Sequence, residues 1–316
     1  MNKVKVILMF CSIFLTCLAR FSLADNTLWV IDRASNELIR LSEDNPSERA
    51  TTAGFNAAKS LIINKNDASV WIADTFNNRV MQISSDGKTK LYIIDDEIGK
   101  PFHIAISSTH RVLWIANSST GEVTKFSLNE MKEIGRIGGF SNPHDIVISP
   151  YDDSVWVSDS DTGEIVRLFY DGSILSRAKF KGFKPDHLTI NPNDGTCWVT
   201  THSKLIARIS SDGKKVLSKL SGFGLPFMII TDREDGSSWV SDPEKGELIK
   251  VSPEGKIIKI VDSFNHCFGL SEINLKDKAF WTADAGSGEI IRVSSEGKIL
   301  ARIGGFREPF MIAAEK

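Results

Sequence analysis

Five of the six histidines in the chain stand beside the ends of short strand-like segments, where the neighbouring residues favour turns. They are His103, His144, His187, His202 and His266. Imidazole is a common metal ligand and the usual acid–base group near neutral pH. Histidines that converge on one point with carboxylates nearby could therefore hold a metal ion or move protons in a reaction.

Two of these histidines have an aspartate beside them, in opposite order: His144-Asp145 and Asp186-His187. His187 is the second residue after the preceding proline, as is His103, whereas His144 is the first. Successive strand residues point to opposite sides, so the imidazoles do not all aim at one point. The reversed order instead predicts two crossed histidine–carboxylate pairs between neighbouring repeats.

We therefore expect a ligand-binding site that draws on both dipeptides and on the other histidines. Its candidate residues are His103, His144, Asp145, Asp186, His187, His202 and His266. His144 and His187 are the candidate metal ligands, and zinc or calcium is the candidate ion. No residue is assigned a catalytic role from the sequence.

The elements that must position these residues follow from the tryptophans. All seven stand in the same strand-like motif, 41 to 43 residues apart: Trp29, Trp71, Trp114, Trp156, Trp198, Trp239 and Trp281. A fixed period of this length indicates one supersecondary unit that is copied seven times. A large aromatic residue at the same place in every copy predicts a core position between the copies.

Each repeat contains four short β-branched runs separated by turn residues, which we call strands a to d. In residues 139–180 they are expected at 144–149, 155–159, 164–169 and 174–180. Asp-Gly or Glu-Gly pairs such as 171–172 separate strands c and d, as two-residue hairpins require. The sequence therefore predicts an all-β, seven-bladed β-propeller with four antiparallel strands per blade.

The two ends of the chain predict how the propeller closes. The first repeat begins at Leu28 with strand b, and residues 304–312 repeat only a loop and strand a. The C-terminal strand should therefore complete the first blade. In this arrangement the five histidines lie on the channel-mouth face. An aspartate also ends strand b in five repeats (Asp32, Asp74, Asp159, Asp242 and Asp284), and we expect it to bond the backbone of the following turn.

Residues 1–24 predict a signal peptide, with Lys3 and Lys5 before an apolar run and small residues before a cut after Ala24. The propeller is then 25–316, and the expected location is secreted or periplasmic. The first segment holds three of the 38 basic residues and none of the 40 acidic ones, so the remainder carries a net charge of −5. That charge argues against a nucleic-acid partner. We expect no membrane span in 25–316, a monomer, and buried unpaired thiols at Cys197 and Cys267.

The repeat pattern Pro-x-x-Ile-x-Ile-x-Pro-x-Asp-x-x-Val-Trp-Val-x-Asp resembles the NHL-repeat propellers, most closely in 143–167 and 226–250. Related propellers differ in activity. Peptidyl-hydroxyglycine amidating lyases hold zinc with histidines at inner-strand starts, and residues 143–146 resemble such a motif, while 185–188 are offset by one position. Gluconolactonase-type propellers hold calcium with Glu, Asn and Asp, and here His144 stands where the Asn is expected. The virginiamycin lyase type is similar in fold.

The resemblance implies two alternatives for function. Many NHL propellers are binding platforms, so the leading expectation is an exported scaffold that binds a protein or a small-molecule ligand through the channel-mouth face. The alternative is a metal-dependent lyase or hydrolase, amidating-lyase-like or lactonase-like, that uses the histidine cluster on that face.

Overall fold

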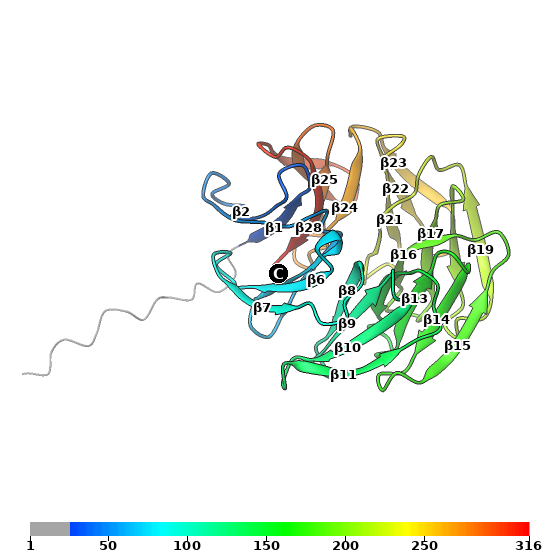
Figure 1. Cartoon of the computed structure of the whole chain (residues 1–316). Coiled ribbons are helices and arrows are strands. Elements are labelled where there is room, and N and C mark those ends of the chain that lie inside the picture. Colours follow the sequence, from blue (N-terminus) through cyan, green and yellow to red (C-terminus); the bar gives the residue numbers. More distant parts are fainter. Residues whose placement is uncertain (1–25, 316) are drawn as a thin grey trace, which may run out of the picture.

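The computed structural model describes residues 26–315 and consists of seven four-stranded antiparallel sheets. The colours of Figure 1 run around the molecule from blue to red, and red β28 lies beside blue β1. This is the predicted seven-bladed propeller. The predicted signal peptide, 1–24, lies outside the described residues.

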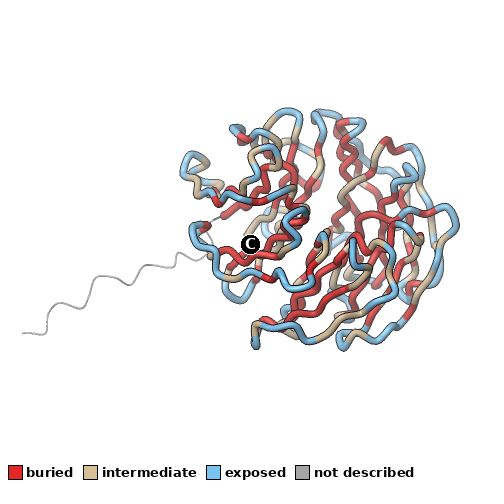
Figure 2. The backbone as a smooth tube through the Cα atoms, in the orientation of Figure 1, coloured by how far each residue is buried: buried red, intermediate tan, exposed pale blue. Residues whose placement is uncertain are grey.

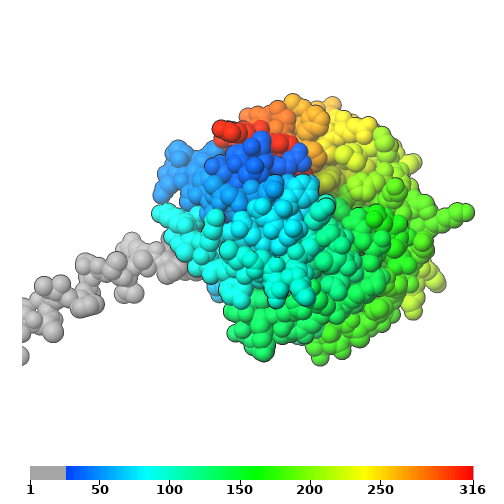
Figure 3. Space-filling model, viewed as in Figure 1, coloured from blue at the N-terminus to red at the C-terminus, as the bar shows by residue number. Residues whose placement is uncertain are grey.

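The first blade joins the two ends of the described chain. Its sheet has the order β28 (Pro309–Ala314), β1 (Thr27–Asp32), β2 (Glu37–Ser42) and β3 (Arg49–Ala53). Leu28 pairs with Ala314 and Ile31 with Met311, antiparallel. The predicted closure by the C-terminal strand is confirmed, and the red and blue atoms meet on the surface in Figure 3.

The other six blades each use four consecutive strands. Blade 2 contains β4 (Ser60–Ile63), β5 (Val70–Asp74), β6 (Arg79–Ile83) and β7 (Lys90–Ile94), and blade 3 contains β8 (Pro101–Ser107), β9 (Val112–Asn117), β10 (Glu122–Ser127) and β11 (Lys132–Ile137). Blade 4 contains β12 (Pro143–Ile148), β13 (Val155–Asp159), β14 (Glu164–Leu168) and β15 (Ile174–Lys179), and blade 5 contains β16 (Pro185–Ile190), β17 (Cys197–Thr201), β18 (Leu205–Ile209) and β19 (Val216–Ser221).

Blade 6 contains β20 (Ile229–Thr231), β21 (Ser238–Asp242), β22 (Glu247–Val251) and β23 (Ile257–Val261), and blade 7 contains β24 (Cys267–Leu270), β25 (Ala279–Asp284), β26 (Glu289–Ser294) and β27 (Ile299–Ile303). One turn of 3-10 helix, η1 (Thr75–Asn77), follows β5. In residues 26–315 no helix is suited to crossing a lipid bilayer.

The core lies between the blades. Six of the seven tryptophans are at most 1% exposed and Trp281 is 3% exposed, which confirms their predicted core position. Figure 2 shows the inner strands buried and the loops exposed. Cys197 and Cys267 are buried free thiols, as predicted. At the hairpin between β14 and β15, Gly172 has a φ of +101°, the conformation for which Asp-Gly turns are favoured.

The first strands of the blades surround the central channel, because β12 packs against both β8 and β16, and β28 against β4 and β24. A bulge interrupts the pairing of several of these strands near their beginning. Hydroxyl groups on the second strands bond the backbone there. The Ser158 hydroxyl accepts a hydrogen bond from Asp145 N (2.9 Å) and donates one to Asp186 O (2.7 Å). It thereby fixes the starts of β12 and β16 relative to each other.

Candidate functional site

The bulged residues form two rings around the opening of the channel. Each blade contributes one residue to the first ring, which we call the mouth ring and which lies at the start of the blade's first strand. Its members are Lys59, Phe102, His144, Asp186, Phe227, Phe268 and Phe310. The next residue gives the second ring: Ser60, His103, Asp145, His187, Met228, Gly269 and Met311. The one-residue offset predicted from the sequence therefore places His144 in the mouth ring and His103 and His187 in the second ring.

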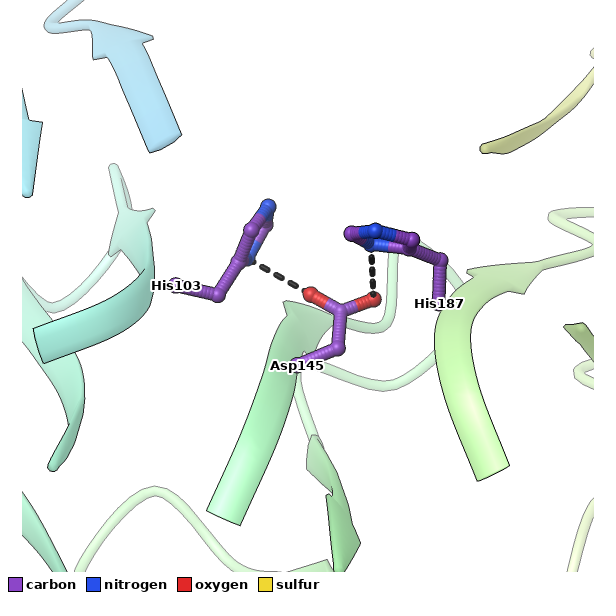
Figure 4. A group of neighbouring side chains, drawn as sticks. All are labelled: His103, Asp145 and His187. Atoms are coloured by element: carbon purple, nitrogen blue, oxygen red, sulfur yellow. Dashed lines mark ion pairs between the residues drawn. The ribbon is translucent and has the colours of Figure 1, made fainter. Parts of the chain in front are cut away.

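In the second ring, Asp145 lies between two imidazoles (Figure 4). His103 Nδ1 is 2.6 Å from Asp145 Oδ1, and His187 Nδ1 is 3.6 Å from Oδ2. The carboxylate also accepts two backbone hydrogen bonds, from Ile146 N (2.8 Å) and Leu188 N (2.6 Å). Asp145 therefore joins three blades and is well satisfied, so its first role is to position the histidines on each side.

The surroundings of His103 determine which of its nitrogens carries the proton. Its Nδ1 faces Asp145 Oδ1 and, at 3.1 Å, the carbonyl oxygen of Ile146. Both neighbours only accept hydrogen bonds, so Nδ1 holds the proton in the neutral ring. His103 Nε2, on the far side of the ring from Asp145, then has a free lone pair and can act as a base.

In the mouth ring, Asp186 is the centre of a second group. His144 Nδ1 lies 2.8 Å from Asp186 Oδ1, and His202 Nε2 lies 3.6 Å from Oδ2. Asp186 is fully buried, and neither carboxylate oxygen accepts a well-aligned hydrogen bond from the described residues. Burial raises the pKa of Asp186, but the nearby His187, His144 and His202 outweigh burial and lower it. A buried carboxylate without hydrogen bonds is costly unless something else compensates its charge.

His187 lies between the two groups, with Nε2 3.9 Å from Asp186 Oδ1. Both of its ring nitrogens are buried and without a hydrogen bond to the described residues. Burial lowers the pKa of His187, but Asp186 and Asp145 outweigh burial and raise it. Burial conversely raises the pKa of Asp145, while His103 and His187 together hold it well below its usual range.

Both groups have a donor set that suits a metal ion. The donor atoms of His103, Asp145 and His187 all lie within 4.8 Å of one another, and so do those of His144, Asp186 and His202. In the first group the carboxylate is already occupied by backbone amides. In the second it is unsatisfied, and the side chain of His202 is 45% exposed, which leaves a route from solvent. The group around Asp186 is therefore the better candidate metal site.

The rest of the mouth ring is aromatic and cationic. The centroids of the Phe227, Phe268 and Phe310 rings lie 5.3 to 5.7 Å apart. The Lys59 ammonium lies 5.2 Å from the Phe310 centroid and 5.6 Å from that of Phe102. Phe102 packs on His144 at 4.1 Å. These contacts run along the mouth ring from the phenylalanines through Lys59 and Phe102 to His144 and Asp186, with histidine and aspartate on one side and phenylalanine on the other.

The structure brings together six of the seven candidate residues from the sequence, with both crossed pairs present. The seventh, His266, is exposed and contacts Asn265 Oδ1 (3.0 Å) outside the two groups. His144 and His187, paired as candidate ligands, lie in different groups, 5.9 Å apart between ring centroids.

The aspartates at the ends of the second strands have a structural role. Asp159 accepts hydrogen bonds from Ser141 N (2.8 Å) and Asn142 N (3.0 Å), and Asp242 does the same with Gly224 and Leu225. The expectation that these aspartates bond backbone is confirmed, but their closest partners lie in the loop that enters the blade. The turn after the strand is a longer contact, 3.4 Å from Thr162 N to Asp159.

Lys59 and the phenylalanines of the mouth ring were not identified from the sequence. A signal for three of them was present, since Phe102, Phe227 and Phe310 each follow a proline, as His144 and Asp186 do. Lys59 follows Ala58 instead, so counting from the proline does not find it.

Below the rings the channel contains a cavity of about 250 Å³. His103 lines its inner end, and most of its wall is aliphatic, from β8, β12 and β16. At the opposite face it is bordered by Pro150, Pro192 and Arg233, in the turns between first and second strands.

The comparisons with known proteins agree with a propeller. Residues 78–214 match the family model described as Arylesterase. No curated protein matches the sequence of this chain. A catalytically inactive histidine-to-alanine variant of virginiamycin B lyase from Staphylococcus aureus, solved with quinupristin, is similar in fold, with 18% identity, a TM-score of 0.67 and coverage of 78% of this chain and 84% of that one.

Two further structures are similar over nearly the whole chain. A putative 6-phosphogluconolactonase from Bacteroides uniformis ATCC 8492 has 15% identity and a TM-score of 0.74, covering 92% of this chain and 100% of that one. A functionally unknown protein from Desulfotomaculum acetoxidans DSM 771 has 15% identity and a TM-score of 0.76, covering 92% and 98%. At these identities the likeness shows the fold alone.

Proposed function

We propose that this chain is an exported NHL-type propeller that acts as a metal-dependent hydrolase or lyase at its channel mouth. The Arylesterase match and the lyase and putative lactonase among the structural neighbours support an enzyme over a pure binding scaffold. The signal-peptide pattern of residues 1–24 supports export.

The observation that carries the proposal is the state of Asp186. Its carboxylate is fully buried, accepts no hydrogen bond from the described residues, and faces His144 and His202. A cation bound by these three side chains would compensate this charge. Two imidazoles and one carboxylate form a donor set typical of zinc, whereas calcium prefers six to eight oxygens. Zinc or a similar transition metal is therefore favoured over calcium.

A metal ion in this position would supply Lewis-acid polarisation of a substrate carbonyl oxygen. The chain itself would supply the base. His103 Nε2 is free to take a proton, either from the water that attacks an ester or lactone or from a carbon next to a carbonyl group in an elimination. Asp145 holds the opposite nitrogen of His103 at 2.6 Å and so positions the ring for this transfer.

The first test is the metal content of the mature chain, measured by elemental analysis. We expect about one equivalent in the parent and in His266→Ala, which removes an exposed histidine outside both groups, and a loss in Asp186→Asn and His144→Ala. The same samples would be tested for turnover of aryl esters and lactones. A parent without metal, or metal retained in both site variants, would refute the proposed metal site.

The second test addresses the base. If His103 takes the proton, His103→Gln should lower kcat/KM by about 10²- to 10⁴-fold while the bound metal is retained, since general base catalysis contributes that much. Equal activity of parent and variant would exclude this role.

A further inference from the structure

The Lys59 ammonium lies at the channel mouth without a polar partner. Among residues 26–315 it forms no ion pair and no hydrogen bond, and its contacts are the faces of Phe102 and Phe310. Burial lowers the pKa of Lys59 and the positive charge of Arg33 lowers it further, while Asp186 and Glu308, both beyond ion-pairing distance of Lys59, offset part of this decrease. The fold therefore holds an amino group at a half-buried place where an anionic partner would be favourable.

The neighbouring cation differs in this respect. Arg33 lies 4.8 Å from the Phe310 centroid, but its guanidinium is paired with Glu308. Asp186, in the same ring, is surrounded by His144, His187 and His202, and none of its oxygens is within ion-pairing distance of Lys59. Lys59 is therefore the available cation of the mouth ring.

Flat apolar surface lies next to this cation. Phe227 and Phe268 are half-buried at the opening and contact each other and Phe310. Phenylalanine faces and edges favour stacked or edge-on contact with another ring. A molecule that covers these phenyl groups would bring a substituent within reach of Lys59 on one side and of the imidazoles on the other.

We infer that the channel mouth takes substrates that join an aromatic ring to a carboxylate or similar anionic oxygen, and that Lys59 binds the anion. This inference rests on the proposed function, because it assigns the substrate class of the same site. Lys59 determines specificity and takes no part in proton transfer, which belongs to His103.

The experiment compares one ring compound in a charged and an uncharged form. The mature chain, as purified with its metal, would be titrated calorimetrically with 4-phenylbutyrate and with 4-phenylbutanamide. We expect roughly tenfold tighter binding of the carboxylate, the size of one charge-assisted hydrogen bond. Lys59→Met should remove this preference and leave amide binding nearly unchanged, while Lys59→Arg should retain it.

Lys65→Met is the matched control, because Lys65 is exposed in the turn after β4 and pairs with Glu272. It should bind both compounds as the parent does. Equal binding of the two compounds by the parent, or a carboxylate preference that survives in Lys59→Met, would overturn the inference. Unfolding temperatures of all variants would establish that each is folded.

The two proposals fail separately. A parent that holds no metal and turns over no ester or lactone, but prefers the carboxylate through Lys59, would refute the proposed function and support the anion site as a binding site. A metal-loaded, active enzyme that binds both compounds equally would support the proposed function and refute the anion site at Lys59.

Discussion

The two buried aspartates of the channel mouth should respond differently to the same substitution. Asp145 and Asp186 stand in neighbouring blades, in the second ring and in the mouth ring respectively, and both are at most 1% exposed. Replacing either with Asn preserves the shape of the side chain and removes the negative charge. The structure predicts that Asp145→Asn destabilises the fold more than Asp186→Asn does.

The difference follows from hydrogen bonding. Asp145 accepts from Ile146 N and Leu188 N through its two oxygens and holds His103 as well. An Asn amide group would direct N–H groups at one of these donors, leaving a buried N–H unsatisfied and weakening the contact with the imidazole. We expect a loss of about 2–4 kcal/mol, from the cost of an unsatisfied buried donor and of a broken charged contact.

Asp186 accepts no hydrogen bond that Asn would lose. Removing its charge forfeits attraction to His144, His187 and His202 but relieves the cost of burying the carboxylate. The attraction outweighs the burial cost, because the neighbouring histidines hold the pKa of Asp186 below its usual value. The metal-free protein should therefore lose some stability, but less than in Asp145→Asn, where backbone hydrogen bonds are lost as well.

The assay is equilibrium unfolding in urea, in the presence of a chelator, near neutral pH. A second series with zinc should separate the variants further, since a bound metal stabilises only the proteins that retain the site. The reasoning is refuted if Asp186→Asn destabilises the metal-free protein as much as Asp145→Asn does.

Three other predictions follow. Deleting 304–316 removes the inner strand of blade 1, with buried Phe310, and should cost roughly 5–8 kcal/mol or cause aggregation; an unchanged melting temperature would contradict the closure. Burial raises the pKa of Cys267 to about 12 and that of Cys197 well above its usual value, so neither thiol should react with a disulfide reagent until the protein unfolds. The raised pKa of His187 contributes stability that is complete below its unfolded pKa of 6.5 and is lost as the pH rises through the folded pKa. Above about pH 6, the free energy of unfolding should therefore fall less steeply with pH in His187→Gln than in the parent.

The fold could be predicted because its signal is repeated seven times. The expected strands in 139–180 agree with β12 to β15 within one residue at each end. Each tryptophan marks the second strand of a blade, and the incomplete first and last repeats determine the closure. Local signals that recur in every copy support one another, so an error in a single repeat has little effect.

The site could be predicted in part, because the opposite order of His144-Asp145 and Asp186-His187 can be read directly from the amino-acid sequence. Their crossed pairing requires only that neighbouring blades share a register. The aromatic and cationic side of the mouth could not be found this way. Phenylalanine is usually a core residue, and Lys59 becomes informative only when the structure shows that no carboxylate pairs with it.

Hydrogen bonding, rather than residue type, distinguishes an aspartate with a structural role from a candidate metal ligand in this fold. Asp159 and Asp186 are both fully buried aspartates near the same face. Asp159 recurs in most blades and is satisfied by two backbone amides of its own blade. Asp186 occurs once at its ring position and accepts nothing from the fold. Only histidines offset the charge of Asp186 within the fold, and a bound cation would add to them. The departure from the repeat pattern and the missing backbone hydrogen bonds therefore point to the same residue.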